Sequence, residues 1–199
     1  MATRNGERLL TREDWTRAAM GAIGAGGLAA VAVDRLATQL GASRGSFYWH
    51  FKNRQDLLTA ALATWEQEGS TDVETALRKV EAPAERLRTI FATAFAHPLA
   101  ADIEAALAAM AGDPLVAPVL ERVTAARLRV LRQIFADLGY DEDECDVRAR
   151  VFHVIYLGHG QARRATPEVY AGTGYIERLM TMLLSPESRD MSGPAAPRA

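Results

Sequence analysis

The stretch from Val33 to Leu58, VDRLATQLGASRGSFYWHFKNRQDLL, constrains the fold of this chain more than any other part. Leu36 and Leu40 have the spacing of a short helix, and Gly41 follows where a left-handed residue ends a helix at little steric cost. Ser43 is then a good N-cap for a second short helix. Two short helices around a tight turn are the pattern of a helix-turn-helix.

The second of these helices is expected to have two different faces. Phe47 and Phe51 repeat at i, i+4 and are predicted to face inward. The opposite face repeats cationic and hydrogen-bonding side chains at the same spacing, as a recognition helix does in the major groove of DNA. The residues of that outer face are Arg44, Tyr48 and Lys52.

Three consecutive aromatic residues, Phe47, Tyr48 and Trp49, argue against an ordinary amphipathic surface helix. Consecutive helical positions point in different directions, so the three cannot all be buried. At least one is therefore presented outward, which is unusual without a partner. Gly45 and Ser46 are small and would let the helix N-terminus approach a phosphate backbone. The whole motif favours DNA binding over a solvated helix face.

The segment LATQLGASRGSFYWHFKNRQDLL resembles the signature of the tetracycline-repressor (TetR) family of bacterial regulators. The resemblance covers about the first third of the chain and is specific, because it fixes residue types over a long consecutive run. It implies an all-helical homodimer whose N-terminal three-helix domain binds operator DNA. The C-terminal helices would bind a small effector and the sister subunit.

The family pattern implies a role for each residue of the recognition helix. Arg44, Gly45 and Tyr48 would lie at base edges. Ser46 and His50, together with Tyr48, would lie near the DNA backbone.

Phosphate contacts are also implied beyond the recognition helix. Arg54 would hold a phosphate where the family usually has Lys, and Lys52 lies one turn beyond Tyr48 and adds a further contact. The complete predicted DNA-binding set is Arg44, Gly45, Ser46, Tyr48, Trp49, His50, Lys52 and Arg54.

Two departures from the family pattern concern the helix before the turn. Ala32 and Val33 stand where the family commonly has Ser or Thr, so this helix loses an N-cap and a hydroxyl contact to phosphate. Asp34 lies in the first turn, where its charge suits the helix macrodipole. Because that charge lies near the DNA, it either repels phosphate weakly or accepts a hydrogen bond from a cytosine amine.

The net charge of −2 by itself argues against a nucleic-acid binder, but the distribution of the charge favours one. Residues 1–60 carry eight Lys and Arg against five Asp and Glu, a net charge of +3. Residues 61–199 carry fifteen against twenty, a net charge of −5. The basic excess thus coincides with the helix-turn-helix, as a modular DNA binder requires.

The composition indicates a soluble cytoplasmic protein. The sequence contains no run of about 18 uncharged apolar residues, so no membrane span is predicted. The first ten residues lack the apolar region of a signal peptide. The single Cys145 excludes an intrachain disulfide and suits a reducing compartment.

The rest of the chain has helical periodicity. Thr11 with Asp14 resembles a capping box, and the first helix is expected to run to about Gly24, with Gly24, Gly26 and Gly27 breaking it. Asn53 can cap a fourth helix, and Asp113-Pro114 has the pattern of an N-cap and first residue of a long helix. The predicted fold is all-α, with a three-helix helix-turn-helix domain at 9–56 (motif 33–52), a helical effector-binding and dimerisation domain at 57–184, and a disordered tail at 185–199.

Two features of the C-terminal half bear on dimerisation and metals. His153 to Gly160 reads HVIYLGHG, whose small Gly158 and Gly160 would allow a close helix approach between subunits, or packing inside one subunit. The acidic run DEDECD opens a helix and lacks the spacing of a calcium loop, so no metal and no cofactor are expected. Further residues predicted at the subunit interface are Leu179, Met182 and Leu183.

A cavity for a mostly apolar or aromatic effector is expected between the C-terminal helices, although each of its predicted residues is equally a candidate for simple core. His97 and His153 are the polar groups that would orient a ligand. The predicted set is Trp65, Phe91, Phe95, His97, Met110, Phe152, His153 and Tyr156.

The sequence therefore predicts a ligand-responsive repressor that binds a palindromic operator as a homodimer. An activator, or an effector-independent DNA binder of the same fold, is the alternative. A helical protein-interaction bundle would explain the helices but not an outward Tyr48 between cations. No nucleophile elbow, phosphate loop or Cys-His pair predicts an enzyme.

Overall fold

The computed structural model describes residues 3–4, 7–8, 10–96, 98–170 and 174–184. Almost all of these residues are helical, which confirms the predicted all-α class; the short pair of N-terminal strands was not predicted. The elements are β1 (Thr3–Arg4), β2 (Glu7–Arg8), α1 (Arg12–Ala30), α2 (Val33–Gln39), α3 (Arg44–His50), α4 (Arg54–Glu66), the π-helical η1 (Gln67–Asp72), α5 (Val73–Leu77), α6 (Pro83–Ala96), α7 (Pro98–Ala108), α8 (Ala117–Asp137), α9 (Glu142–Ala165) and α10 (Gly174–Leu184).

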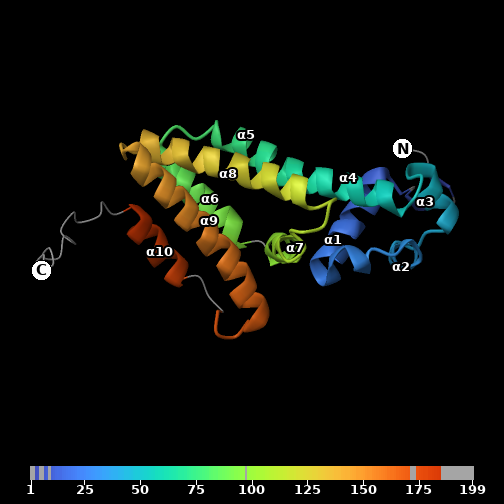
Figure 1. Ribbon diagram of the computed structural model, residues 1–199. Coiled ribbons are helices and arrows are strands. Elements are labelled where there is room, and N and C mark those ends of the chain that lie inside the picture. Colours follow the sequence, from blue (N-terminus) through green and yellow to red (C-terminus); the bar gives the residue numbers. More distant parts are fainter. Residues whose placement is uncertain (1–2, 5–6, 9, 97, 171–173, 185–199) are drawn as a thin grey trace, which may run out of the picture.

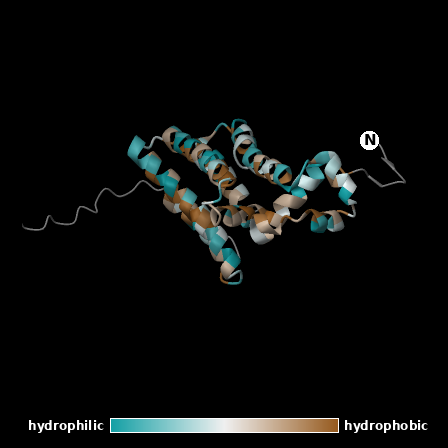
Figure 2. Ribbon diagram, turned by 45° about the vertical axis from the view of Figure 1, so that its right-hand side comes forward, coloured by the Kyte–Doolittle hydropathy of each residue, from teal (hydrophilic) through white to brown (hydrophobic). Residues whose placement is uncertain are grey.

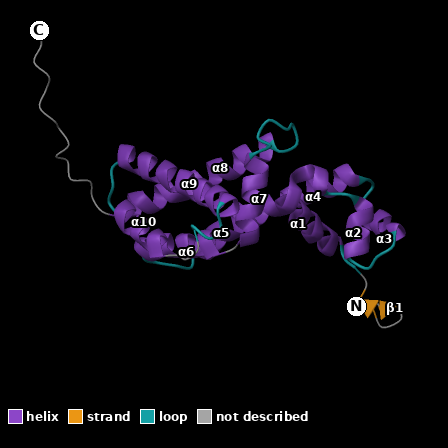
Figure 3. Ribbon diagram, turned by 90° about the horizontal axis from the view of Figure 1, so that it is seen from below, coloured by secondary structure: helices purple, strands orange, loops and turns teal. Residues whose placement is uncertain are grey.

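The molecule is elongated, with two parts joined end to end (Figures 1 and 3). Helices α1 to α4 form a head at one end, and α5, α6, α8, α9 and α10 form a body at the other. Helix α7 lies between them and packs mainly on α1 and α9. Hydrophobic stretches gather in the middle of the molecule (brown in Figure 2), so the two parts share an apolar junction.

Local signals fix the ends of the helices in the head. The capping box at α1 forms as predicted, because Asp14 N donates to Thr11 Oγ1 at 3.3 Å and Thr11 N donates to Asp14 Oδ2 at 2.7 Å. Helix α1 does not end at Gly24, which is helical; its break comes at Gly26 and Gly27, the latter with φ of 70°. That conformation favours glycine, so the predicted break is confirmed at two of the three glycines.

The helix-turn-helix forms as predicted. Ala32 precedes α2 without a side-chain cap, Gly41 has φ of 63° in the turn, and Ser43 Oγ accepts from Ser46 N at 3.3 Å to begin α3. Asn53 Oδ1 caps α4 in the same way, accepting from Asp56 N at 2.9 Å. Short-range hydrogen bonds therefore set the turn without help from the body.

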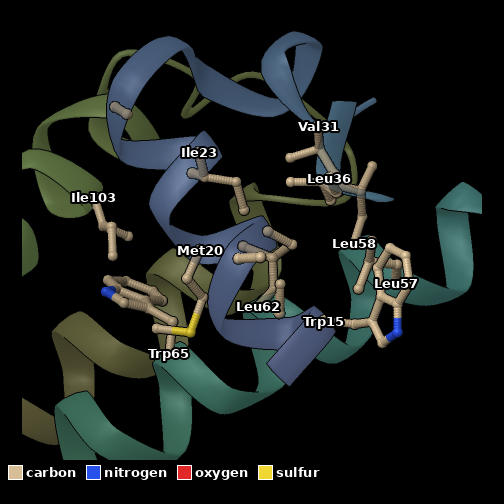
Figure 4. Packing of buried hydrophobic residues seen from close by; sticks show 14 of the residues in the cluster. Trp15, Met20, Ile23, Val31, Leu36, Leu57, Leu58, Leu62, Trp65 and Ile103 are labelled. Atoms are coloured by element: carbon tan, nitrogen blue, oxygen red, sulfur yellow. The ribbon is translucent and has the colours of Figure 1, made fainter. Parts of the chain in front are cut away.

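The core of the head extends into α7. Trp15 and Phe47 meet edge to face with ring centroids 5.4 Å apart, and Phe47 stacks on Phe51. At the other end of the same cluster, Met20 of α1, Trp65 of α4 and Ile103 of α7 lie together (Figure 4). Burial of this apolar surface makes α7 part of the head's core as well as of the body.

Close approach of α7 to α1 depends on a glycine. A methyl group at Gly24 would lie 3.2 Å from Ile103 Cγ1 and 3.4 Å from the Ile103 backbone N. Arg164 of α9 reinforces this contact, because it donates to the carbonyl oxygens of Gly24 and Asp102 at 3.0 and 3.3 Å. Helices α1, α7 and α9 thus meet at one point.

The predicted start of α8 is wrong. Asp113 Oδ1 accepts from Leu115 N at 2.8 Å, so Asp113 closes a turn, and the helix begins only at Ala117. The helix ends at Asp137, just before Gly139, which has φ of 92°. Helix α9 then begins as predicted, with Asp141 capping an acidic first turn.

Within the described residues, no single helix is long and apolar enough to cross a membrane, although the bent pair Pro83–Phe95 and Leu99–Ala108, at 81° to each other, passes a test of length and composition. The described His, Cys, Asp and Glu side chains form no group of three or more that could hold a metal ion. The predicted tail at 185–199 lies outside the described residues.

Candidate DNA-binding surface and ligand cavity

The outer face of α3 exposes two of its three consecutive aromatic residues. Phe47 is completely buried, whereas Tyr48 is 58% exposed and Trp49 is 88% exposed. The Tyr48 ring packs edge to face on Phe47 with centroids 5.1 Å apart, which steadies it on the helix surface. The expectation that at least one aromatic residue points outward is therefore confirmed.

Arg44 stands at the first turn of the same helix and pairs with an acidic residue on α2. Its Nε lies 2.7 Å from Asp34 Oδ1, and both side chains are about two-thirds exposed. An exposed pair of this kind contributes about 1 kcal/mol at most, so an incoming base or phosphate can break it. Asp34 thus has a third role that the sequence did not suggest, which is to hold Arg44 in the free protein.

Gly45 and Ser46 lie exposed, or nearly so, at the start of α3. A methyl group at Gly45 would meet only Ser43 Oγ, at an ordinary contact distance of 3.5 Å. The fold itself therefore does not demand glycine here. Any requirement for glycine must come from a partner that approaches the helix.

His50 is tied to the N-terminal arm of the head. Its Nε2 lies 3.0 Å from the carbonyl oxygen of Leu10, so this nitrogen carries the proton and donates. Arg12 donates to the His50 carbonyl and stacks 4.2 Å over the Phe51 ring. The His50 ring, which the family pattern assigns to the DNA backbone, thus already has an internal partner.

Arg54 also has an internal role that the sequence did not reveal. Its Nε donates to the carbonyl oxygen of Val31 at 2.6 Å, and its Nη2 donates to that of Leu28. These carbonyls end α1 and lead into α2, so Arg54 clamps the start of α4 to that junction. Lys52, by contrast, exposes its side chain, and only its backbone N is engaged, donating to Asp56 Oδ2 at 3.0 Å.

A cavity of about 580 Å³ lies in the body beside the head. Its size is that of a small-molecule site. Four of the predicted effector residues line it: Trp65, Phe152, His153 and Tyr156. Met20 and Ile103 of the head's core also line it, so a ligand there would touch both parts of the molecule.

Three other predicted pocket residues do not line this cavity. Phe91 packs edge to face on Phe152, with centroids 4.6 Å apart, and is core. Phe95 faces α9, and its ring centroid lies 5.0 Å from that of His159. Met110 packs over Gly27, and a methyl group added to this glycine would lie 3.1 Å from Met110 Sδ. Phe91 and Phe95 belong to α6 and Met110 to the turn after α7, and residue spacing alone does not specify which of them reaches the cavity. His97 lies outside the described residues.

The sequence did not predict the ion pair in the cavity wall. Glu104 of α7 is only 3% exposed, and Arg127 of α8 lies with its Nη1 2.8 Å from Glu104 Oε1. Glu104 left only a weak signal, because it and Asp102 are the two acidic residues of a largely apolar helix and nothing in the sequence shows which of them is buried. Arg127 left none, because α8 carries several arginines and only packing shows which one is covered.

The cavity wall shifts the acidity of two neighbouring side chains. Burial, with a smaller effect of Arg127, lowers the pKa of His153 to about 4, so the imidazole is neutral at pH 7. Burial, together with the Glu104 charge, raises the pKa of Tyr156 to about 12. His153 and Tyr156 are therefore neutral hydrogen-bonding groups beside one ion pair.

The outer face of α9 carries an exposed apolar stripe. Val147, Val151 and Val154 are 53%, 41% and 66% exposed at i, i+4, i+7, so they lie on one side of the helix. A methyl group at Gly158, one turn further along, would meet nothing within 4 Å. We refer to these four residues as the α9 stripe.

Three residues predicted at a subunit interface pack inside the subunit. A methyl group at Gly160 would lie 3.6 Å from Ala101, so the close approach it allows is to α7. Leu183 is 8% exposed and belongs to the body's core, and Leu179 packs against that core. Met182 is 69% exposed and stays available.

Comparison with known proteins agrees with this arrangement. Residues 16–61 match the family described as bacterial regulatory proteins, tetR family. A TetR regulator from Legionella pneumophila shares the fold with a TM-score of 0.73 at 15% identity, over 90% of this chain and 97% of that one. A transcriptional regulator from Rhodococcus sp. Rha1 gives 0.69 at 21% identity, over 88% and 94%.

A further structure with this fold contains a ligand. It is the regulator FadR from Bacillus subtilis in complex with stearoyl-CoA, with a TM-score of 0.68 at 15% identity over 88% of this chain and 98% of that one. The family match and the shared fold agree with the resemblance seen in the sequence: residues 16–61 form a TetR-family helix-turn-helix domain, and the chain as a whole has the fold of TetR-family transcriptional regulators.

Proposed function

We propose that this protein is a ligand-responsive repressor that binds a palindromic operator as a homodimer. The observation that carries the proposal is α3, whose inner side is anchored by a fully buried Phe47 while its outer side exposes Tyr48 and Trp49 beside Arg44. A short, rigid helix with exposed aromatic and cationic groups suits readout of base edges in the major groove. Because DNA lies in the bacterial cytoplasm, that is where we expect the protein to act.

In this proposal some residues of the head contact base edges and others contact the sugar-phosphate backbone of the DNA. Arg44 and Tyr48 contact base edges, and Gly45 allows the backbone of α3 to come close. Trp49 and Lys52, both exposed, contact the sugar-phosphate backbone. Phosphate contacts fix the register of the helix, and base contacts select the sequence.

The α9 stripe supports a homodimer. It runs along one side of the longest helix, where a second copy related by a two-fold axis would cover it with the same residues. Apolar side chains that are exposed side by side, rather than scattered singly, are typical of a surface that binds a partner. We expect Val154→Asp to dissociate the dimer in sedimentation analysis, whereas Val169→Asp, at an exposed valine outside the stripe, leaves it intact.

The cavity supports response to a ligand. Met20, Trp65 and Ile103 belong to both the cavity wall and the core of the head. A ligand that moves them therefore changes the packing on which the two recognition helices depend for their spacing. Such coupling requires that the ligand bind the DNA-free state more tightly than the DNA-bound state.

The proposal is tested by selecting bound sequences from random duplex DNA and measuring affinity for the recovered site. Arg44→Ala should lose at least about tenfold in affinity for the selected site, with helix content unchanged. Arg88→Ala is the matched control, because Arg88 is also an exposed arginine in an ion pair, but on α6. If no sequence is enriched, or if both variants bind alike, the assignment is wrong.

A further inference from the structure

Glu104 is a buried carboxylate that the protein does not satisfy. It is 3% exposed, it lines the cavity, and neither of its oxygens accepts a hydrogen bond from any described residue. A buried charge costs several kcal/mol unless it is both paired and hydrogen-bonded. A cavity that contains such a group is prepared for a hydrogen-bond donor.

Arg127 pairs with Glu104 only in part. The two charges are close, with Nη1 2.8 Å from Oε1, but the N–H is not aimed at the carboxylate. Arg127 is held by other partners instead: its Nε donates to the Gly69 carbonyl at 3.1 Å, and its guanidinium lies 5.6 and 5.5 Å from the rings of Trp65 and Tyr156. The lone pairs of Glu104 remain available to a molecule in the cavity.

The charges around the cavity favour a cation. Four carboxylates line it against the one guanidinium of Arg127, and His153 is neutral at pH 7. An anionic head group would meet this excess of negative charge wherever it entered. Glu74 pairs with Arg78 and Glu104 lies beside Arg127, whereas Glu68 and Asp72 pair with no cation among the described residues. The lining acids are Glu68, Asp72, Glu74 and Glu104.

The rest of the wall is apolar. Leu77, Ile90, Val130 and Phe152 contribute aliphatic and aromatic surface to the same space. A fully charged or strongly hydrated ligand would not pack against this apolar surface. A purely apolar ligand would leave the Glu104 carboxylate without a hydrogen-bond donor. The wall therefore calls for a ligand with one cationic end and an apolar body.

We propose that the cavity binds an amphipathic organic cation whose ammonium or amidinium N–H groups donate to Glu104 and whose apolar body packs against Phe152 and its aliphatic neighbours. This inference rests on the proposed ligand-responsive function and names the class of its ligand. Glu104 directly follows Ile103, which packs on Gly24 of α1. A ligand that forms hydrogen bonds with the Glu104 carboxylate therefore acts directly on α7, the helix that contacts the head.

The test uses three probes with the same ten-carbon chain and different head groups: decylammonium, decanol and decanoate. Titration calorimetry on the full chain at pH 7, below the micelle concentration of each probe, should give the tightest binding for decylammonium and the weakest for decanoate. Glu104→Gln should weaken decylammonium binding at least about tenfold and leave decanol binding nearly unchanged. Asp102→Asn, on the same helix but not in the cavity wall, should leave both unchanged.

Three results would overturn the proposal: no binding of decylammonium, decanoate binding as tightly as decylammonium, or an unchanged preference in Glu104→Gln. If Glu104→Gln does not fold, the order of the three head groups on the unsubstituted protein still decides. The measurement contains no DNA. Ammonium binding without any selected operator would therefore defeat the proposed repressor function alone, and operator binding without ammonium binding would defeat this inference alone.

Discussion

Sequence and structure assign different roles to Arg54. The family pattern assigns it to a DNA phosphate, but in the structure its guanidinium donates to the carbonyl oxygens of Leu28 and Val31. Arg54→Ala would remove both bonds, and Val31 is a completely buried residue. Leaving a buried carbonyl without a donor costs about 1–3 kcal/mol, so we take about 2 kcal/mol for this variant.

That loss is measurable as a change in thermal stability. In a chain of 199 residues, 1 kcal/mol corresponds to roughly 2–4 °C, so Arg54→Ala should lower Tm by about 4–8 °C. Arg54→Lys keeps the charge but offers no fork to reach two carbonyls, so it should lose part of the same stability. Lys52→Ala, which removes an exposed cation two residues away, should stay within about 0.5 kcal/mol of the unsubstituted protein.

Salt dependence of DNA affinity provides the second readout. A residue that contacts phosphate contributes about one unit to the slope of log affinity against log salt concentration. Lys52→Ala should lower this slope by about one, and Arg54→Ala should leave it unchanged. The clamp interpretation is refuted if Arg54→Ala melts within about 1 °C of the unsubstituted protein and lowers the slope instead.

Two further predictions concern stability. As pH falls below 6.5 the unfolded chain protonates His153 before the folded one does, because its folded pKa is about 4. The contribution of His153 to stability should therefore fall by about 1–2 kcal/mol between pH 7 and pH 5, and urea titrations of His153→Gln should show a drop smaller by that amount. If the variant keeps the full pH dependence, His153 is not the buried neutral group described. Gly24→Ala should be destabilising by about 1–3 kcal/mol because of Ile103, whereas Gly21→Ala on the same helix, where a methyl group meets nothing within 4 Å, should be stabilising by about 0.5–1 kcal/mol. Equal effects of the two glycine substitutions in chemical denaturation would show that α7 does not press on α1.

The features that the sequence determined by itself are short-range. Thr11, Ser43 and Asn53 cap helices through bonds to residues three positions away, and Gly41 ends α2 through its own backbone freedom. Apolar spacing likewise fixed which side of α3 is inward, because helical geometry relates neighbours without reference to the rest of the chain. These signals were sufficient for the helix-turn-helix and its exposed aromatic residues.

Tertiary structure alone decided the partners that are far apart in sequence. Arg54 meets Leu28, and Arg127 meets Glu104, only after separate helices have packed, and no local pattern records which charge will be covered. The same holds for the effector cavity: Tyr156 lines it and Phe95 does not, because the wall depends on how α6 and α9 are rotated against each other. Helical periodicity gives the direction of a side chain relative to its own axis, and only packing gives the orientation of that axis in the molecule.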